Sequence, residues 1–276
     1  MSFPRAKKRL GQNFLVDESY ARRVVASLAL RAGETVVEIG PGRGALTAPL
    51  LESGARVVAV EFDRELNALL RERFGGREEF RLVEADALNV DFCSAIEPAR
   101  EARVVANLPY NISTAILQRL IEQRRCLKEF VLMLQREVVE RITARPGESE
   151  RGYLTVLVEA FCESEALFDV PPEAFRPVPK VWSTVARLRA RDSAASEVDE
   201  QLFTRLVSAC FAQKRKTIHN NLRSAPEELR TLVETAGGAT ALLEAANVDP
   251  RRRAEALTLE EWAALAKRLQ SRDRPD

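Results

Sequence analysis

The sequence predicts an α/β protein in which a mostly parallel sheet, covered by helices, is followed by a small helical domain. Five short β-branched runs begin at residues 34, 56, 80, 103 and 129, and helix-like segments separate them. This alternation is typical of βαβ crossovers in a parallel sheet that is covered on both faces. From about Ser193 onward, apolar residues recur at helical spacing instead.

Two further apolar runs close the predicted sheet. Residues 155–161 and 181–190 are not separated by a helix-length amphipathic segment, so we expect them to form an antiparallel closing pair. The result is a seven-stranded sheet with an antiparallel last strand. The connecting loop contains prolines that exclude helix and central strand, because they fix φ and lack an N–H donor: Pro171, Pro172, Pro177 and Pro179.

The chain is long enough for two domains of unequal size, with 276 residues of which 46% are hydrophobic. A small, polar stretch at residues 191–196 marks the boundary between them. We therefore expect one domain over residues 1–192, which includes a basic N-terminal arm, and a helical domain over residues 193–276. Trp182 and Trp262 are interpreted as core anchors.

Composition argues against several classes of protein. No stretch approaches the roughly 20 unbroken apolar residues that a membrane span needs. The four cysteines, at positions 93, 126, 162 and 210, have neither a metal-ligand spacing nor the pattern of a disulfide framework. We therefore expect a cytoplasmic protein with reduced thiols, no metal and no membrane partner.

The net charge of +1 conceals an uneven distribution of basic residues. Residues 1–31 hold seven Lys and Arg against two acids, and residues 176–191 and 201–223 each hold five against none. A polyanion could bind these segments if the fold brings them to one side. In particular, the cluster Lys214-Arg215-Lys216 with Arg223 has no acidic neighbour in sequence, which favours phosphate contacts.

The ends of the first three predicted strands have the features of a nucleoside site. Gly40, Gly42 and Gly44 follow the first strand, where glycine lets the backbone turn sharply and approach a ligand. Glu61 ends the second strand and can accept hydrogen bonds from both ribose hydroxyls, and Asp86 ends the third. The spacing G-x-G-x-G differs from the nicotinamide fingerprint, which disfavours an oxidoreductase.

The fourth strand ends in a specific tetrapeptide, Asn107-Leu108-Pro109-Tyr110. An exocyclic adenine amine is a poor nucleophile, so an enzyme must orient it for in-line displacement. The Asn107 amide oxygen and the Leu108 carbonyl, which Pro109 restricts, could accept hydrogen bonds from that amine. Tyr110 offers a ring on which an extruded base could stack. This chemistry requires no side chain with a tuned pKa.

With these motifs, the chain resembles the ribosomal RNA adenine N6,N6-dimethyltransferases, a family of class I methyltransferases with a Rossmann-like sheet. The likeness extends over nearly the whole length, through Lys7-Lys8-Arg9-Leu10-Gly11-Gln12-Asn13-Phe14-Leu15, the glycine loop, Asn107-Leu108-Pro109-Tyr110, Phe175-Arg176-Pro177-Val178-Pro179-Lys180-Val181, Lys214-Arg215-Lys216-Thr217, Asn220-Asn221-Leu222 and Val248-Asp249-Pro250. It is greatest to the bacterial branch that dimethylates two adjacent adenosines near the 3′ end of small-subunit (16S) rRNA.

The resemblance implies S-adenosyl-L-methionine as cofactor and assigns residues to it. The implied cofactor contacts are Gln12, Asn13, Leu15, Gly40, Gly42, Glu61, Asp86 and Asn107. Tyr110 and Phe175 correspond to an aromatic pair that sandwiches the target adenine, beside Asn107, Leu108 and Pro109. The expected RNA contacts are Lys7, Lys8, Arg9, Lys180, Lys214, Arg215, Lys216 and Arg223. Two positions depart from the family pattern: Arg151 where it has Tyr, and Glu159 where it has Gln.

The resemblance further implies a monomer that acts on small-subunit rRNA within a precursor 30S particle and takes part in small-subunit maturation. Two alternatives share most of its motifs. One is a large-subunit rRNA adenine methylase of the antibiotic-resistance type, against which the helical domain with Lys214-Arg215-Lys216 and Asn220-Asn221 argues. The other is a ribosome-assembly factor whose binding matters more than its methylation.

Overall fold

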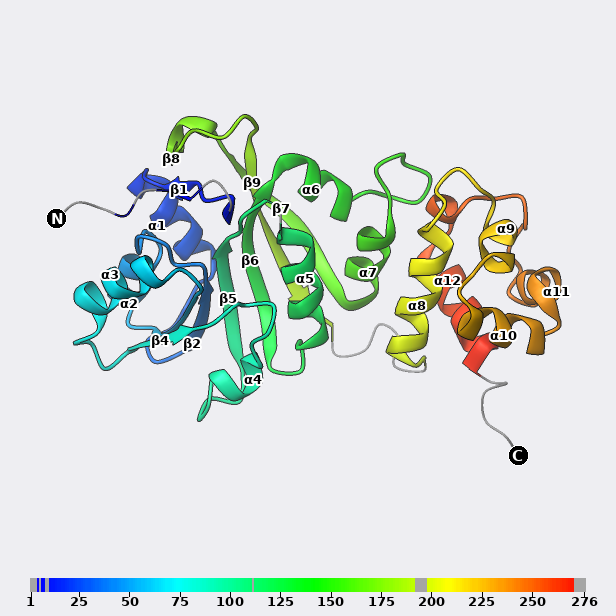
Figure 1. The fold of residues 1–276 in the computed structure, drawn as a ribbon, viewed down its shortest axis with the longest axis horizontal. Helices are drawn as coiled ribbons and strands as arrows, with labels where there is room; N and C mark the ends of the chain where they lie inside the picture. Colours follow the sequence, from blue (N-terminus) through cyan, green and yellow to red (C-terminus); the bar gives the residue numbers. More distant parts are fainter. Residues whose placement is uncertain (1–3, 5, 8–9, 111, 192–197, 271–276) are drawn as a thin grey trace. The chain divides into compact units, whose positions relative to one another are not determined.

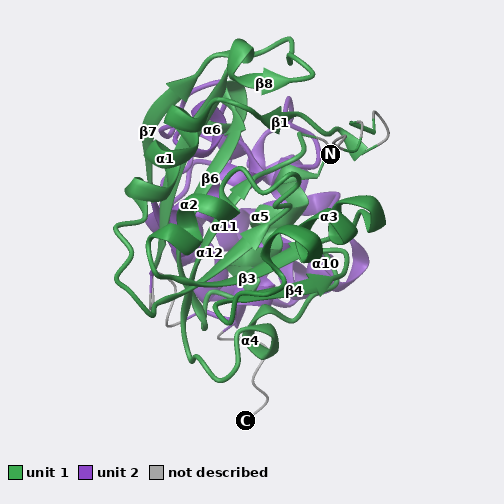
Figure 2. Cartoon of the chain, turned by 90° about the vertical axis from the view of Figure 1, so that its left-hand side faces the viewer, with its two compact units in different colours: residues 1–139, 164–190 green, residues 140–163, 191–276 purple. Residues whose placement is uncertain are grey.

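A computed structural model describes residues 4, 6–7, 10–110, 112–191 and 198–270. The chain divides into two compact units, one of residues 1–139 with 164–190 and the other of residues 140–163 with 191–276 (Figure 2). We call these unit 1 and unit 2.

A seven-stranded sheet forms the centre of unit 1, as predicted. Its order is β4-β3-β2-β5-β6-β9-β7. Neighbours from β4 to β6 pair in parallel, whereas β9 pairs antiparallel with β6, so the antiparallel last strand is confirmed. The strands are β2 (Thr35–Ile39), β3 (Arg56–Glu61), β4 (Phe80–Glu84), β5 (Ala102–Asn107), β6 (Leu127–Gln135), β7 (Cys162–Val170) and β9 (Ser183–Ala190).

Helices lie beside the sheet and bury its central strands (Figure 1). They are α1 (Glu18–Ser27), α2 (Thr47–Glu52), α3 (Arg64–Phe74), α4 (Phe92–Ala95) and α5 (Ser113–Glu122). Asp17, Asp63 and Asp91 cap α1, α3 and α4 by accepting from backbone N–H groups of the first turn. Covered on both faces, the central strands are apolar along most of their length: Val104, Val105 and residues 130–134 are at most 1% exposed.

A second, two-stranded sheet joins the N-terminal arm to the proline-rich loop. β1 (Phe14–Leu15) pairs antiparallel with β8 (Phe175–Arg176), which follows the short 3-10 helix η2 (Pro172–Ala174). This pairing joins residues 160 positions apart, with Leu15 opposite Phe175. It fixes the arm beside the ends of the central strands.

The strand predicted at residues 155–161 is wrong, because this run belongs to the helix α7 (Tyr153–Phe161). The helix is buried on nearly every side, so its apolar run has no period that separates helix from strand. The last-but-one strand is instead β7, whose sequence CESEALFDV carries charges that an edge strand can expose.

Unit 2 is helical, as predicted for the C-terminal part. Besides α7 it contains the C-terminal end of α6 (Arg136–Ile142), then α8 (Glu200–Phe211), α9 (Ile218–Arg223), α10 (Glu227–Thr235), α11 (Gly238–Ala245), η3 (Ala254–Ala256) and α12 (Leu259–Gln270). Trp262 is fully buried and stacks on Phe211, with ring centroids 5.9 Å apart. Unit 2 differs from the predicted helical domain by including residues 140–163, and the expected boundary falls among residues 192–197, outside the described part.

The two departures from the family pattern lie together in unit 2. Arg151 is fully buried, and its Nη2 lies 2.5 Å from a carboxylate oxygen of Glu159. The guanidinium also donates to the carbonyls of Ala144 at 3.2 Å and Leu257 at 3.3 Å. The Glu159 carboxylate therefore neutralises the buried Arg151 guanidinium.

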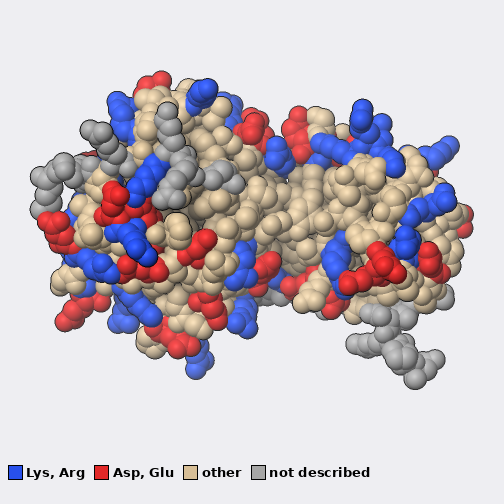
Figure 3. Space-filling model, viewed as in Figure 1, with Lys and Arg blue, Asp and Glu red and all other residues tan. Residues whose placement is uncertain are grey.

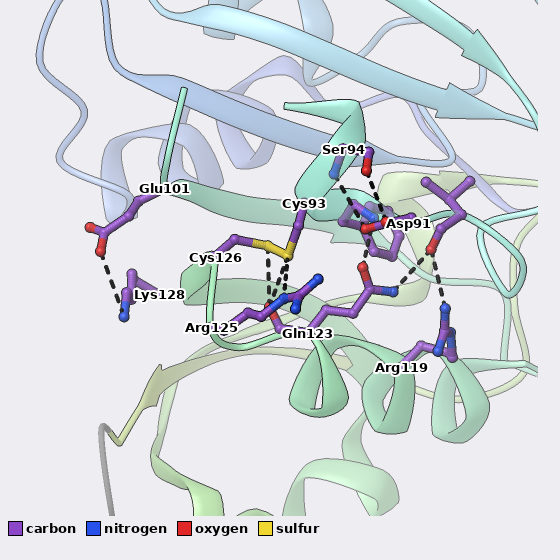
Figure 4. The surroundings of a disulfide bond; sticks show 11 residues. Asp91, Cys93, Ser94, Glu101, Arg119, Gln123, Arg125, Cys126 and Lys128 are labelled. Atoms are coloured by element: carbon purple, nitrogen blue, oxygen red, sulfur yellow. Dashed lines mark hydrogen bonds and ion pairs between the residues drawn. A yellow bond between two sulfur atoms is a disulfide. The ribbon is translucent and has the colours of Figure 1, made fainter. Parts of the chain in front are cut away.

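The prediction that all four cysteines are reduced is wrong for two of them. Cys93 and Cys126 form a disulfide (Figure 4). Cys162 and Cys210 are buried and take part in no disulfide. Gln123 joins the same segments by accepting from Phe92 N–H at 2.6 Å and donating to the Val90 carbonyl at 2.9 Å. The disulfide thus links α4 to the connection between α5 and β6.

Among the described residues, no helix is long and apolar enough to span a bilayer. The same part of the chain contains no group of three or more His, Cys, Asp or Glu side chains placed to hold a metal ion.

Candidate functional site

A pocket of about 230 Å³ lies at the carboxyl ends of β2, β3, β4 and β5. Successive strands are added on one side of β2 as far as β4, and from β5 onward they are added on its other side. The position between β2 and β5 is therefore a topological switch point, which is where open α/β sheets bind ligands. Every residue expected to contact cofactor lines this pocket, as does the whole tetrapeptide: Gln12, Asn13, Leu15, Gly40, Gly42, Glu61, Asp86, Asn107, Leu108, Pro109 and Tyr110.

The glycine loop presents bare backbone to this space. Gly40 has φ +65°, and a Cβ added there would meet no atom within 4 Å. At Gly42, with φ +58°, an added Cβ would lie 3.1 Å from the Phe14 ring. A side chain at Gly40 would thus project into open space, and its residue would be strained at this positive φ. Glycine is therefore suited to a loop that a ligand approaches closely.

Glu61 is held rigidly at the end of β3. Its carboxylate accepts from Gly42 N–H at 3.1 Å and from the N–H groups of Phe62 and Asp63 at 2.9 Å each. Burial raises the pKa of the Glu61 carboxyl, and these three backbone donors oppose that rise. The side chain is therefore an oriented acceptor, as recognition of two neighbouring hydroxyls requires.

Among the pocket residues that the sequence analysis did not predict are Phe62 and Glu38. The Phe62 ring is 59% exposed and lines the pocket directly after Glu61, where a flat ligand could stack. Glu38 is 1% exposed and accepts from Thr47 Oγ1 at 2.7 Å, while its Oε1 has no hydrogen-bond partner in the described structure. Burial raises the pKa of Glu38 to about 8. Glu38 lies just before the glycine loop and Phe62 directly follows Glu61. Their position next to predicted site residues is the sequence feature that could have identified them.

Asp86 combines a structural role with a place in the pocket. One carboxylate oxygen accepts from Leu88 N–H at 3.0 Å, which stabilises the turn after β4. The residue also lines the pocket beside Ala85 and Ala87. A second carboxylate oxygen remains to accept from a ligand.

The tetrapeptide is fixed from two sides. Asn107 Nδ2 donates to the Asn13 carbonyl at 3.0 Å, which orients the amide, and none of the described residues donates to its oxygen. The Tyr110 hydroxyl lies 2.9 Å from Ser183 Oγ, and burial raises its pKa. The N-terminal arm and β9 therefore set the geometry of the two side chains that face the pocket.

The N-terminal arm is fastened across this end of the sheet. Lys7 Nζ lies 2.7 Å from Asp63 and 2.9 Å from Glu65, and Gln12 Nε2 donates to Asp63 at 3.3 Å. Burial alone would raise the pKa of the Asp63 carboxyl. The hydrogen bonds that Asp63 accepts from Lys7, from Glu65 N–H and from Gln12 outweigh burial and hold this pKa below its usual value. Arg43 donates to the Pro4 carbonyl at 2.7 Å. Lys7, expected to contact RNA, is thus engaged within the protein.

Two aromatic residues lie differently from expectation. Phe175 is fully buried in the core of unit 1 and does not line the pocket, because β8 pairs with β1 and directs its ring inward. The structure therefore does not bring Phe175 and Tyr110 to face each other across the site. Trp182, interpreted as a core anchor, is 46% exposed, so that interpretation is wrong.

Most of the expected RNA contacts are exposed. Lys180 lies on unit 1, and unit 2 presents Lys214, Arg215, Lys216 and Arg223. Figure 3 shows Lys and Arg side chains gathered along the upper edge of unit 2. Lys8 and Arg9 lie outside the described residues.

Comparison with known proteins agrees with this site. A family model described as ribosomal RNA adenine dimethylase matches residues 4–268. The chain belongs to this family. It is therefore an enzyme that methylates adenine in ribosomal RNA.

Curated relatives in the family are similar over nearly their whole length. The ribosomal RNA small subunit methyltransferase A of Saccharophagus degradans is 42% identical over 268 residues, which covers 96% of this chain and 95% of the relative. The protein of the same name from Moorella thermoacetica is 44% identical over 273 residues, covering 96% and 92%.

Solved structures show the same fold. The 23S rRNA methyltransferase ErmE is 30% identical, with a TM-score of 0.65 over 94% of this chain and all of the other. A dimethyladenosine transferase from Plasmodium falciparum matches with a TM-score of 0.75 at 24% identity, covering 91% of this chain and 95% of that one.

Proposed function

We propose that this chain transfers methyl groups from S-adenosylmethionine to N6 of two adjacent adenosines near the 3′ end of small-subunit rRNA, giving N6,N6-dimethyladenosine. The observation that carries the proposal is the Asn107 amide, anchored by Asn13 and held in the same pocket as Glu61. Identity of 42–44% to small-subunit enzymes over nearly full length favours that substrate over large-subunit rRNA.

The residues of the pocket fit S-adenosylmethionine. The bare backbone at Gly40 leaves room for the ligand, and the oriented Glu61 carboxylate would accept from both ribose hydroxyls. Asp86 would accept from the adenine amine, and the exposed Phe62 ring would stack on that base. Gln12, Asn13 and Leu15 would cover the ligand from the arm. The cofactor supplies an electrophilic methyl group on a sulfonium that leaves as a neutral thioether.

The tetrapeptide would position the target. The Asn107 oxygen and the Leu108 carbonyl would accept hydrogen bonds from the N6 amine and orient its lone pair toward the methyl group. Pro109 would restrict Leu108, and the Tyr110 ring would stack on the extruded base. No side chain needs to take a proton in the transition state. The stacking role expected for Phe175 would require its ring to leave the core.

Further features of the proposal concern the substrate particle. Lys180, Lys214, Arg215, Lys216 and Arg223 would contact rRNA phosphates, with Lys8 and Arg9 as further contacts. The substrate would be a precursor 30S particle in the cytoplasm, and the enzyme would act as a monomer during small-subunit maturation.

Two measurements test the proposal. Full-length protein, S-adenosylmethionine and unmethylated small-subunit particles should yield two adjacent N6,N6-dimethyladenosines, detected by mass spectrometry of the digested RNA. Large-subunit RNA serves as the comparison, and methylation of that RNA alone would contradict the assignment.

Glu61→Ala should weaken cofactor binding in calorimetry, whereas Glu52→Ala, an exposed acid of α2, should leave it unchanged. Equal affinity of Glu61→Ala and wild type would refute the ribose role.

A further inference from the structure

The segment between the buried residues Phe175 and Ser183 exposes an unusual group of apolar side chains. Five large hydrophobic side chains are exposed in the described structure, and three of them lie here: Val178 at 52%, Val181 at 40% and Trp182 at 46%. Pro177 and Pro179 restrict the backbone of this loop. A half-exposed tryptophan on a loop whose backbone is restricted by prolines suggests a binding surface.

The backbone of Trp182 is held at the sheet edge that also carries the pocket. Its carbonyl accepts from Arg136 N–H at 3.0 Å, where β6 passes into α6. The next residue, Ser183, holds the Tyr110 hydroxyl at 2.9 Å. The indole is therefore attached one residue from the contact that positions the target-stacking tyrosine, at the sheet edge where the pocket opens.

Two cations near the indole suit a nucleic acid. Arg176 and Lys180 are exposed within the loop itself. Along β9 and just after it, by contrast, Arg187, Arg189 and Arg191 form ion pairs with acids of neighbouring strands. An aromatic face beside cations is how proteins bind unpaired bases, because the ring stacks on the base while the cation neutralises its phosphate. Ser183, the next residue, contacts Tyr110, which lines the pocket where one adenosine has to leave its stack.

We propose that Trp182 is a stacking platform for the nucleobase adjacent to the adenosine being methylated. This inference rests on the proposed function, in which two neighbouring adenosines are modified. When one base enters the pocket beside Tyr110, its neighbour loses a stacking partner, and the exposed indole replaces that partner. Since Phe175 is buried, Trp182 is the aromatic side chain that the loop presents to RNA.

Tryptophan fluorescence reports this contact directly. The chain has two tryptophans, and Trp262 is fully buried in unit 2. Binding of an unmethylated RNA hairpin that contains the two adenosines should quench wild-type emission, because an indole stacked on a base loses fluorescence. In Trp182→Phe, where Trp262 alone emits, saturating RNA should leave the emission unchanged. Equal quenching in both proteins, or none in wild type at saturation, would overturn the proposal.

Kinetics separate stacking from simple packing. Trp182→Leu keeps apolar bulk but loses the aromatic face, so its KM for small-subunit particles should rise about tenfold while kcat stays near wild type. Trp182→Phe should recover most of the affinity. Cofactor affinity and Tm should match wild type in both variants, which excludes misfolding as the cause. An unchanged KM in Trp182→Leu would overturn the role and leave the patch for a protein partner.

The outcome also distinguishes the two proposals. If wild type dimethylates small-subunit rRNA and Trp182→Leu does so with the same KM, the platform is wrong and the proposed function stands. If wild type methylates only large-subunit RNA, the proposed function fails. Quenching by a large-subunit hairpin with adjacent adenosines would then support the platform, and its absence would overturn it.

Discussion

Glu38 is a buried acid whose surroundings favour the neutral carboxyl. One of its oxygens accepts from Thr47, and the other has no partner among the described residues. Its pKa of about 8 lies above the ordinary value of 4.5 because burial disfavours the charged form. Between these two pH values the folded state therefore binds more protons than the unfolded state.

This difference gives Glu38 a signed effect on stability. A pKa raised on folding makes stability fall as pH rises from about 4.5 to about 8, and the effect is fully present above the folded pKa. Glu38→Gln, a neutral isostere, should remove that fall. Thermal melts without cofactor should show the variant gaining in Tm relative to wild type from pH 5 to pH 8. A Tm difference that is constant across this range would contradict the assignment.

The Arg151–Glu159 pair is predicted to depend on both partners. Arg151 is fully buried, so removing its acid leaves a charge that only backbone carbonyls compensate. Glu159→Ala should lower the free energy of unfolding by about 1–3 kcal/mol, less than for a fully enclosed pair because Glu159 is partly exposed. Denaturant unfolding of the full chain measures this loss.

The family's own residues provide the control for this pair. The double change Arg151→Tyr with Glu159→Gln installs the usual combination and should come within about 1 kcal/mol of wild type, since no unpaired charge remains. In a double-mutant cycle the two changes should therefore be strongly non-additive. Simple addition of the single losses would show that the two side chains are not coupled.

At the residue scale, sequence reasoning predicted which residues lie together where chemistry demands a residue type at a strand end, and their roles stay predictions. Glu61, Asp86 and Asn107 were found this way, and all three line one pocket. It did not work for Phe175 and Trp182, because which aromatic side chain of a loop turns inward depends on pairing with β1. That pairing is a long-range contact with no local sequence signal.

The N-terminal arm acts as one element that completes the pocket. It supplies the acceptor for Asn107, pairs with β8 and is anchored through Lys7 to Asp63 at the start of α3. The hydrogen bond from Lys7 to Asp63, more than that to Glu65, raises the pKa of the lysine, so the ion pair persists at neutral pH.

Lys7→Met keeps the length of the side chain and removes its charge. We expect cofactor affinity to fall about threefold, because a single ion pair whose lysine is partly exposed contributes modestly to holding the arm. The difference from wild type should shrink at high salt, which screens the pair. Calorimetry at two salt concentrations measures both effects. Lys180→Met makes the same change outside the pocket and should bind as wild type does; equal affinities for all three proteins would remove the anchor.

At the scale of elements, regular periodicity was informative and its absence was not. The alternation of strands and helices up to β6 could be predicted, because strands and helices differ in the spacing of their apolar residues. The helix α7 has apolar side chains all round, so only its packing within unit 2 decides its conformation. The Cys93–Cys126 disulfide was missed for a related reason, because spacing along the chain does not encode proximity between α4 and the start of β6.

For the molecule as a whole, the uneven charge predicts how RNA binds. Lys214 and Lys216 are exposed on unit 2, in a run whose sequence neighbours include no acid. In the structure, Lys214 also donates to the Ser149 carbonyl, next to Glu150. The double change Lys214→Glu with Lys216→Glu should weaken RNA binding and reduce the slope of log K against log salt by roughly 1.4–1.8, for two lost phosphate contacts. Filter binding across a salt series measures the slope.

Arg77→Glu with Arg100→Glu provides the matched control for charge. These exposed residues precede β4 and β5, at the sheet edge opposite the pocket, so their reversal should change the salt slope little. Equal slopes for wild type and the Lys214/Lys216 variant would remove that cluster from the interface.

The division of the chain was predicted in outline only. A parallel sheet followed by helices is visible in the order of periodic segments. Assignment of residues 140–163 to the helical unit is not, because it depends on which helices α7 packs against rather than on any break in composition.

The central claim is that the oriented Asn107 amide places the target amine for methyl transfer. Single-turnover methylation of small-subunit particles by Asn107→Ala tests it most directly, with RNA and cofactor affinities measured in parallel. We expect the rate to fall roughly 10²–10³-fold, as for loss of one positioned polar group in an active site, with RNA affinity close to that of wild type. A rate near that of wild type, or equal losses in rate and RNA affinity, would contradict the claim.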